Sequence, residues 1–185
     1  MEAFLVSTGL VALAEVGDKT QLLSLVLAAR FRRPWPIIIG ILIATAANHA
    51  LAAGVGAWVT RLVAPDVLRW ALGLSFIAMA AWMALPDELR LGKPERERFG
   101  ALGTTIIAFF IVEMGDKTQV ATVALAAKYA AYFAVLAGTT AGMMIANIPA
   151  VLLGDRLAGR LPVRLVHGIA ALVFAALGLL VLFSA

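Results

Sequence analysis

Two copies of one charged heptapeptide are the residues of this chain best suited to chemistry. Residues 15–21 read Glu-Val-Gly-Asp-Lys-Thr-Gln, and residues 113–119 read Glu-Met-Gly-Asp-Lys-Thr-Gln. Each copy lies inside a long apolar stretch, where a single charged side chain at the centre of a bilayer costs roughly 2.5–3.5 kcal/mol. A chain keeps such groups in hydrocarbon when they pair with one another or when they perform a function.

The two copies together offer the charges that a divalent cation needs. On a helix, Glu at position i, Asp at i+3 and Lys at i+4 share one face, so each copy is expected to present two carboxylates beside one ammonium group. The four carboxylates are those of Glu15, Asp18, Glu113 and Asp116, and the two ammonium groups are those of Lys19 and Lys117. Four negative and two positive charges leave −2, which matches one divalent cation or two protons.

Neutral oxygens lie near these charges and complete an oxygen-rich set. The candidates are Gln21, Gln119, Thr20 and Thr118 in the motifs, and Asn48, His49 and Asn147 in the helices that follow. Such a set suits Mn²⁺, Ca²⁺ or Mg²⁺ better than copper or zinc. A glycine before each Asp allows close helix approach or local unwinding. The alternative interpretation is structural: interhelical ion pairs, hydroxyls bonded to their own helix, and His49 as a packing group.

Composition places the chain in the membrane. Hydrophobic residues make up 63% and charged residues 14% of its 185 residues, against about 45–50% and 25% in an average soluble domain. That length gives room for about six spans of about 20 residues. The chain has no cysteine, which excludes thiolate metal sites. Its basic residues lie in short connections between apolar runs, as expected for membrane orientation rather than for nucleic-acid binding.

Apolar windows predict an all-α membrane protein with six transmembrane helices in two three-helix repeats. The expected helices cover residues 3–29, 36–59, 67–85, 101–127, 132–153 and 166–185. Residues 1–85 form the first repeat, residues 86–98 a cytoplasmic linker, and residues 99–185 the second repeat. A shift of 98 positions superimposes the heptapeptides and aligns His49 with Asn147, whereas a shift by one more residue aligns Asn48 with Asn147.

Charge in the connections predicts that the second repeat is inverted relative to the first. Ten Lys and Arg residues lie in the connections of one side, against three on the other. The positive-inside rule then places both termini outside the cytoplasm. Inverted repeats around a polar site at mid-membrane are the architecture of many secondary transporters.

The paired E-x-G-D-K-T motifs in a six-span chain resemble the family of Golgi and bacterial Ca²⁺/Mn²⁺:H⁺ antiporters. The resemblance covers nearly the whole chain. It implies a transporter rather than an enzyme, without a cofactor, in which Glu15, Asp18, Glu113 and Asp116 bind the cation. It further implies that Mn²⁺, with Ca²⁺ as a competing substrate, leaves the cytoplasm across a bacterial inner (plasma) membrane in exchange for protons.

Three other functions are compatible with a compact chain of this kind. An exporter of another small solute, such as an amino acid, would need a group that binds a carboxylate, whereas this site is net acidic. A lipid-phosphate phosphatase would need cationic clamps beside its carboxylates, and every arginine here lies in a connection or at a helix end. A passive channel is the third. The sequence leaves four points open: the choice between Mn²⁺ and Ca²⁺, the proton stoichiometry, the roles of Lys19 and Lys117, and homodimer formation.

Overall fold

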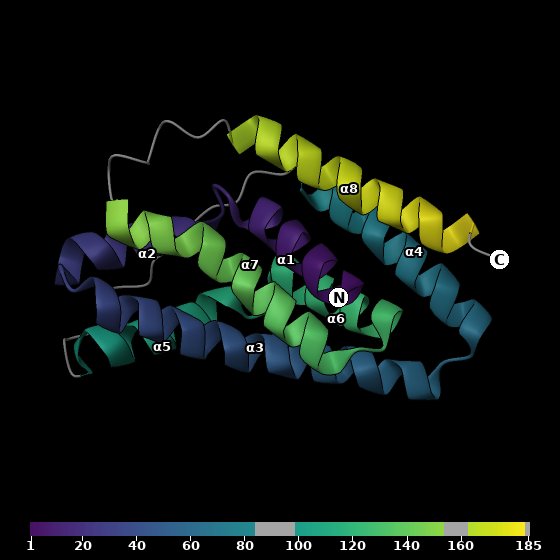
Figure 1. Cartoon of the computed structure of the whole chain (residues 1–185), viewed down its shortest axis with the longest axis horizontal. Coiled ribbons are helices and arrows are strands. Elements are labelled where there is room, and N and C mark those ends of the chain that lie inside the picture. Colours follow the sequence, from purple (N-terminus) through teal and green to yellow (C-terminus); the bar gives the residue numbers. More distant parts are fainter. Residues whose placement is uncertain (84–98, 154–162, 184–185) are drawn as a thin grey trace.

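The computed structural model describes residues 1–83, 99–153 and 163–183, and all regular structure in these ranges is helical. The expected all-α class is therefore confirmed. The eight helices of the described residues are α1 (Glu2–Glu15), α2 (Lys19–Phe31), α3 (Pro34–Leu62), α4 (Pro65–Trp82), α5 (Gly100–Glu113), α6 (Lys117–Tyr129), α7 (Tyr132–Leu153) and α8 (Val163–Phe183) (Figure 1). The expected linker at 86–98 lies outside the described residues.

The expectation of continuous helices over residues 3–29 and 101–127 was wrong, because each is interrupted inside its charged motif. Helix α1 ends at Glu15 and α2 begins at Lys19, and α5 and α6 are separated in the same way. The interruption requires a left-handed residue: Gly17 has φ +79° and Gly115 has φ +77°, values that cost glycine little and other residues more. The charged side chains of a motif therefore do not share one helical face.

The two halves of the chain have the same order of helices at a constant spacing. The first residues of α1, α2, α3 and α4 each precede those of α5, α6, α7 and α8 by 98 positions. Equivalent positions on α3 and α7 are thus His49 and Asn147, which answers the alignment question that the sequence left open.

Helix lengths distinguish two kinds of element. Helices α3, α7 and α8 are long and apolar enough to cross a membrane. Helices α1 and α2 have 14 and 13 residues, or about 20 Å each at 1.5 Å per residue, which is short of the roughly 30 Å hydrocarbon layer. Each pair of short helices therefore supplies about the length of one tilted span.

The first helix of each half packs against the long helix of the other half. Helix α1 lies along α7, and α5 lies along α3. A Cβ atom at Gly138 would lie 2.6 Å from the carbonyl oxygen of Phe4, and one at Gly40 would lie 2.7 Å from Cβ of Thr105. Small residues permit backbones this close, as is common between membrane helices. This exchange of partners brings the two charged motifs together.

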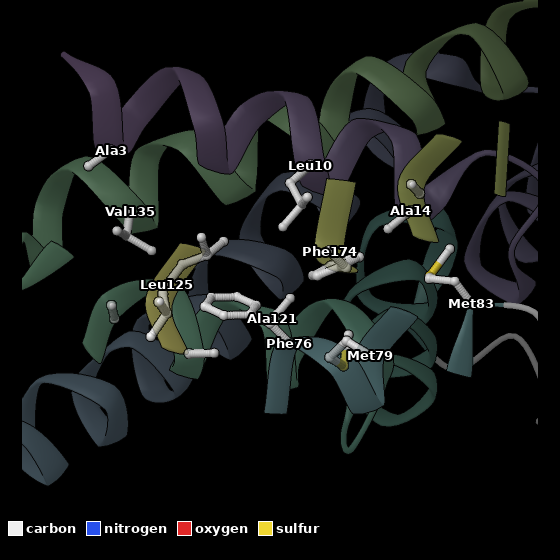
Figure 2. Packing of buried hydrophobic residues seen from close by; sticks show 14 of the residues in the cluster. Ala3, Leu10, Ala14, Phe76, Met79, Met83, Ala121, Leu125, Val135 and Phe174 are labelled. Carbon is white, nitrogen blue, oxygen red and sulfur yellow. The ribbon is translucent and has the colours of Figure 1, made fainter. Parts of the chain in front are cut away.

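Helices α4 and α8 pack side by side at the edge of the bundle (Figure 1). One contact between them joins the equivalent residues Phe76 and Phe174, whose buried rings lie 6.3 Å apart at an interplanar angle of 33°. Figure 2 shows these rings in one buried cluster with Leu10 of α1 and Leu125 of α6. The apolar core therefore fixes the helices that carry the motifs.

Candidate cation site

Each interruption is held open by hydrogen bonds within its own motif. The backbone N–H of Gly17 donates to Oε1 of Gln21 at 2.8 Å, and that of Gly115 donates to Oε1 of Gln119 at 2.6 Å. Asp18 adopts an extended conformation at the N-cap of α2, with φ −77° and ψ 168°, and Asp116 does the same for α6. The positive ends of two helices thus lie at two carboxylates, an arrangement that stabilises negative charge.

Three carboxylates from the two motifs converge at these interruptions. One oxygen each from Glu15, Asp18 and Asp116 lies within 4.8 Å of the others. All three side chains are buried, with exposed fractions of 0%, 1% and 1%. Carboxylates gathered in a low-dielectric interior repel one another unless cations or protons compensate their charge. The arrangement can therefore hold a hard cation through oxygen ligands.

Lys19, the lysine of the first motif, supplies part of this compensation. Nζ of Lys19 lies 2.9 Å from Oδ1 of Asp116, so the ammonium group of the first motif pairs with a carboxylate of the second. The Lys19 side chain keeps 21% of its surface exposed, whereas Lys117 is only 1% exposed. An internal ammonium beside the carboxylates competes with a bound cation for the same oxygens.

The fourth carboxylate, Glu113, lies in a different environment. Nε2 of His49 lies 2.9 Å from its Oε1. The hydroxyl of Thr45 donates to Oε2 at 3.3 Å, and the amide of Asn48 reaches the same oxygen at 3.5 Å. Both Glu113 and His49 are fully buried. Among the described residues, Glu113 is bound by α3 and does not belong to the group of three carboxylates.

The other residues predicted from the sequence surround the site in different ways. Asn147 accepts a hydrogen bond from the hydroxyl of Ser24 at 2.7 Å and donates to the carbonyl of Met143 at 3.1 Å. The hydroxyls of Thr20 and Thr118 are buried without a hydrogen-bond partner in the described part of the chain. The amide oxygens of Gln21 and Gln119 accept backbone hydrogen bonds, so here they cap the interruptions.

Two contacts involve residues that the sequence did not single out as candidate ligands. Thr45 lies one turn before Asn48 and His49, so helical periodicity would have placed it on the same face. Nε2 of His167, on α8, lies 2.7 Å from the carbonyl oxygen of Val16 at the first interruption. No local signal in the sequence indicates that second contact, because it joins residues 151 positions apart.

The chain is similar to known proteins over nearly all its length. A family model described as "Divalent cation/proton antiporter GDT1" matches residues 3–90 and 101–185. The "Putative manganese exporter" of Vibrio cholerae serotype O1 is 47% identical over 184 residues, which are 99% of this chain and 92% of that protein. A GDT1-like protein of Synechocystis sp. is 29% identical over 94% of this chain and 93% of its own length. No solved structure matches.

Proposed function

Because this chain belongs to the GDT1 family of divalent cation/proton antiporters, we propose that it exports Mn²⁺ from the cytoplasm in exchange for protons, with Ca²⁺ as a competing substrate. The family consists of transporters, so the chain is a transporter and not a membrane phosphatase. The name of the Vibrio cholerae relative supports Mn²⁺ as the cargo. That relative also supports placement in a bacterial plasma membrane.

The observation that carries this proposal is the convergence of Glu15, Asp18 and Asp116 from the two halves of the chain. Oxygen ligands alone, without a thiolate, suit Mn²⁺ and Ca²⁺. In the absence of a cation, protons take over its role, because neighbouring carboxylates in a low dielectric cannot all stay ionised. One site that holds either a cation or protons, but not both, couples the two fluxes.

The proposed architecture is six spans in two inverted three-helix repeats. Each pair of short helices serves as one interrupted span, and α3, α4, α7 and α8 supply the others. Three spans per repeat, an odd number, reverse the direction of the second copy, in agreement with the ten-to-three distribution of basic residues. Both termini then face away from the cytoplasm. The constant 98-residue spacing of helix starts supports the duplication.

The mechanism follows from the position of the site between the halves. Movement of one repeat relative to the other opens the carboxylate cluster first to the cytoplasm and then to the outside. Mn²⁺ binds from the cytoplasm and leaves outside, where protons replace it. The protons return to the cytoplasm when the site opens there again. The interruptions assist this movement, because backbone and side-chain groups at helix ends can exchange hydrogen-bond partners without unfolding a helix.

Reconstituted vesicles test this function. Purified protein is placed in proteoliposomes with equal Mn²⁺ concentrations inside and outside and a Mn²⁺-sensitive dye inside, and a proton gradient directed inward is imposed. We expect outward Mn²⁺ movement against its own gradient together with internal acidification. A protonophore should abolish the uphill movement while Mn²⁺/Mn²⁺ exchange continues. Uphill export that persists without a proton gradient, or Mn²⁺ flux without proton movement, would contradict the proposal.

A further inference from the structure

Ser24 and Thr122 occupy equivalent positions on α2 and α6, just after the two motifs, but their hydroxyls bond differently. Thr122 donates to the carbonyl oxygen of Thr118 on its own helix at 2.7 Å. Ser24 instead donates to Oδ1 of Asn147 on α7, also at 2.7 Å. The side chains of Ser24, Thr122 and Asn147 are all fully buried. Ser24 thus joins the two halves of the chain, whereas Thr122 stays bonded within its own helix.

The partners of Asn147 fix the direction in which its amide points. The carbonyl oxygen of Met143 can only accept, so the amide nitrogen, 3.1 Å away, faces it. The amide oxygen then faces Ser24, whose hydroxyl donates. The nitrogen carries a second hydrogen, and the side chain of Asn147 reaches Glu15 of the carboxylate cluster. Sδ of Met143, at 3.2 Å, is only a weak acceptor for that hydrogen. The amide therefore presents a donor, and not an oxygen ligand, to Glu15.

A second contact fixes how α2 lies against α7. Nε2 of Gln21 donates to the carbonyl oxygen of Ala146 at 3.0 Å, and this contact is buried. Gln21 and Ser24 are three residues apart and share one face of α2, and their acceptors belong to consecutive residues of α7. These two side chains thus hold one register between the helices, which keeps the amide of Asn147 beside Glu15.

We propose that Ser24 is a positioning residue of the cation site: its hydroxyl fixes the amide of Asn147, and the amide nitrogen orients the carboxylate of Glu15 for the cation. This inference rests on the proposed function. Without the hydroxyl, the amide oxygen is buried with no donor, and the amide can turn its oxygen toward Glu15, where two acceptors repel each other. The carboxylate then loses its fixed orientation. The cation should bind less tightly, while the steps after binding are unchanged.

Removal of the hydroxyl tests this role. In Ser24→Ala we expect Kd for Mn²⁺, measured at equilibrium on the purified full chain in detergent, to rise about tenfold, as for one hydrogen bond to a charged group. In proteoliposomes, KM for Mn²⁺ should rise by a similar factor while kcat stays within about twofold of the wild-type value. Partial unfolding would instead lower the maximal rate and leave KM unchanged. Thr122→Val, which removes the equivalent hydroxyl, is the matched control and should keep the wild-type Kd and KM.

A double-mutant cycle tests whether Ser24 acts through Asn147. Asn147→Leu keeps the branched shape but removes the amide, so it should also raise Kd about tenfold, and Ser24→Ala should add nothing further in that background. A wild-type or tighter Kd in Ser24→Ala, or the same factor in both backgrounds, would overturn the inference. Loss of all Mn²⁺ binding in Asn147→Leu would also overturn it, because Asn147 would then be a ligand. Failure of the wild-type chain to bind Mn²⁺ would instead contradict the proposed function.

Discussion

Nζ of Lys19 and Oδ1 of Asp116 lie 2.9 Å apart, so an ion pair joins the two motifs. The pair links residues from opposite halves of the chain, at the ends of α2 and α6 where each helix begins. A cation that binds Asp116 must compete with this ammonium group. Entry of the cation and rearrangement of the contact between the halves are thus linked at one carboxylate.

Removal of the Lys19 charge should strengthen Mn²⁺ binding and slow turnover. In Lys19→Gln, Asp116 loses its competing ammonium, and we expect KM for Mn²⁺ to fall about fivefold, equivalent to about 1 kcal/mol for one partly exposed ion pair. Release should slow, so kcat should fall as well. Initial rates of Mn²⁺ flux in proteoliposomes measure both. Lys128→Gln, at the far end of α6, is the matched control, and an equal effect of the two substitutions would refute this role for Lys19.

Neutral amides in place of the clustered carboxylates should stop transport without unfolding the protein. Asp18→Asn and Asp116→Asn keep side-chain volume but remove an anionic ligand for a hard cation. We expect Mn²⁺ flux to fall to the level of empty vesicles, while elution from a sizing column stays that of the wild type. Glu15→Gln and Glu113→Gln should also abolish coupled flux. Asp66→Asn, an exposed carboxylate at the start of α4, should transport normally. Wild-type flux in either aspartate variant would show that transport does not require the cluster.

The two glycines of the interruptions should differ in their tolerance of a methyl group. Alanine at Gly115 has open space, so it should reduce the free energy of unfolding by about 1–2 kcal/mol through its left-handed backbone alone. Alanine at Gly17 carries the same backbone cost and also meets Val163 at the start of α8, which should add about 1–3 kcal/mol. Thermal unfolding in detergent checks the order. Equal losses would show that α8 does not press on the first interruption.

Side-specific labelling tests the inverted repeat. The chain has no cysteine, so a single introduced cysteine reports one position without background. A cysteine within residues 90–98 should react with a membrane-impermeant maleimide only from the cytoplasm, and Lys128→Cys only from outside, because of the charge distribution. Labelling of both positions from the same side would exclude inversion of the second half.

Sequence alone predicted the helical class, because long apolar stretches in a bilayer form helices. It also predicted that the two motifs meet, because they occupy equivalent places in a duplicated unit. It allowed the interruptions only as one of two interpretations of Gly17 and Gly115, beside close helix approach. Glycine is frequent within membrane helices, and the left-handed turn at Gly17 depends on capping by Gln21 and on extended Asp18, which are choices made in three dimensions. The bonds of Glu113 to α3 could not be predicted either, since they depend on how α5 packs against α3.

The interruptions divide each pair of short helices into nearly equal parts, with 14 and 13 residues on either side. In the proposed six-span architecture, a cation held there has crossed about half of the transmembrane voltage. One elementary charge moved through 100 mV changes in free energy by about 2.3 kcal/mol, so a divalent cation halfway across experiences about the same amount. If two protons return for each divalent cation, the full cycle carries no net charge. Voltage then alters how readily the site fills from each side, while the final concentration ratio depends on the proton gradient alone.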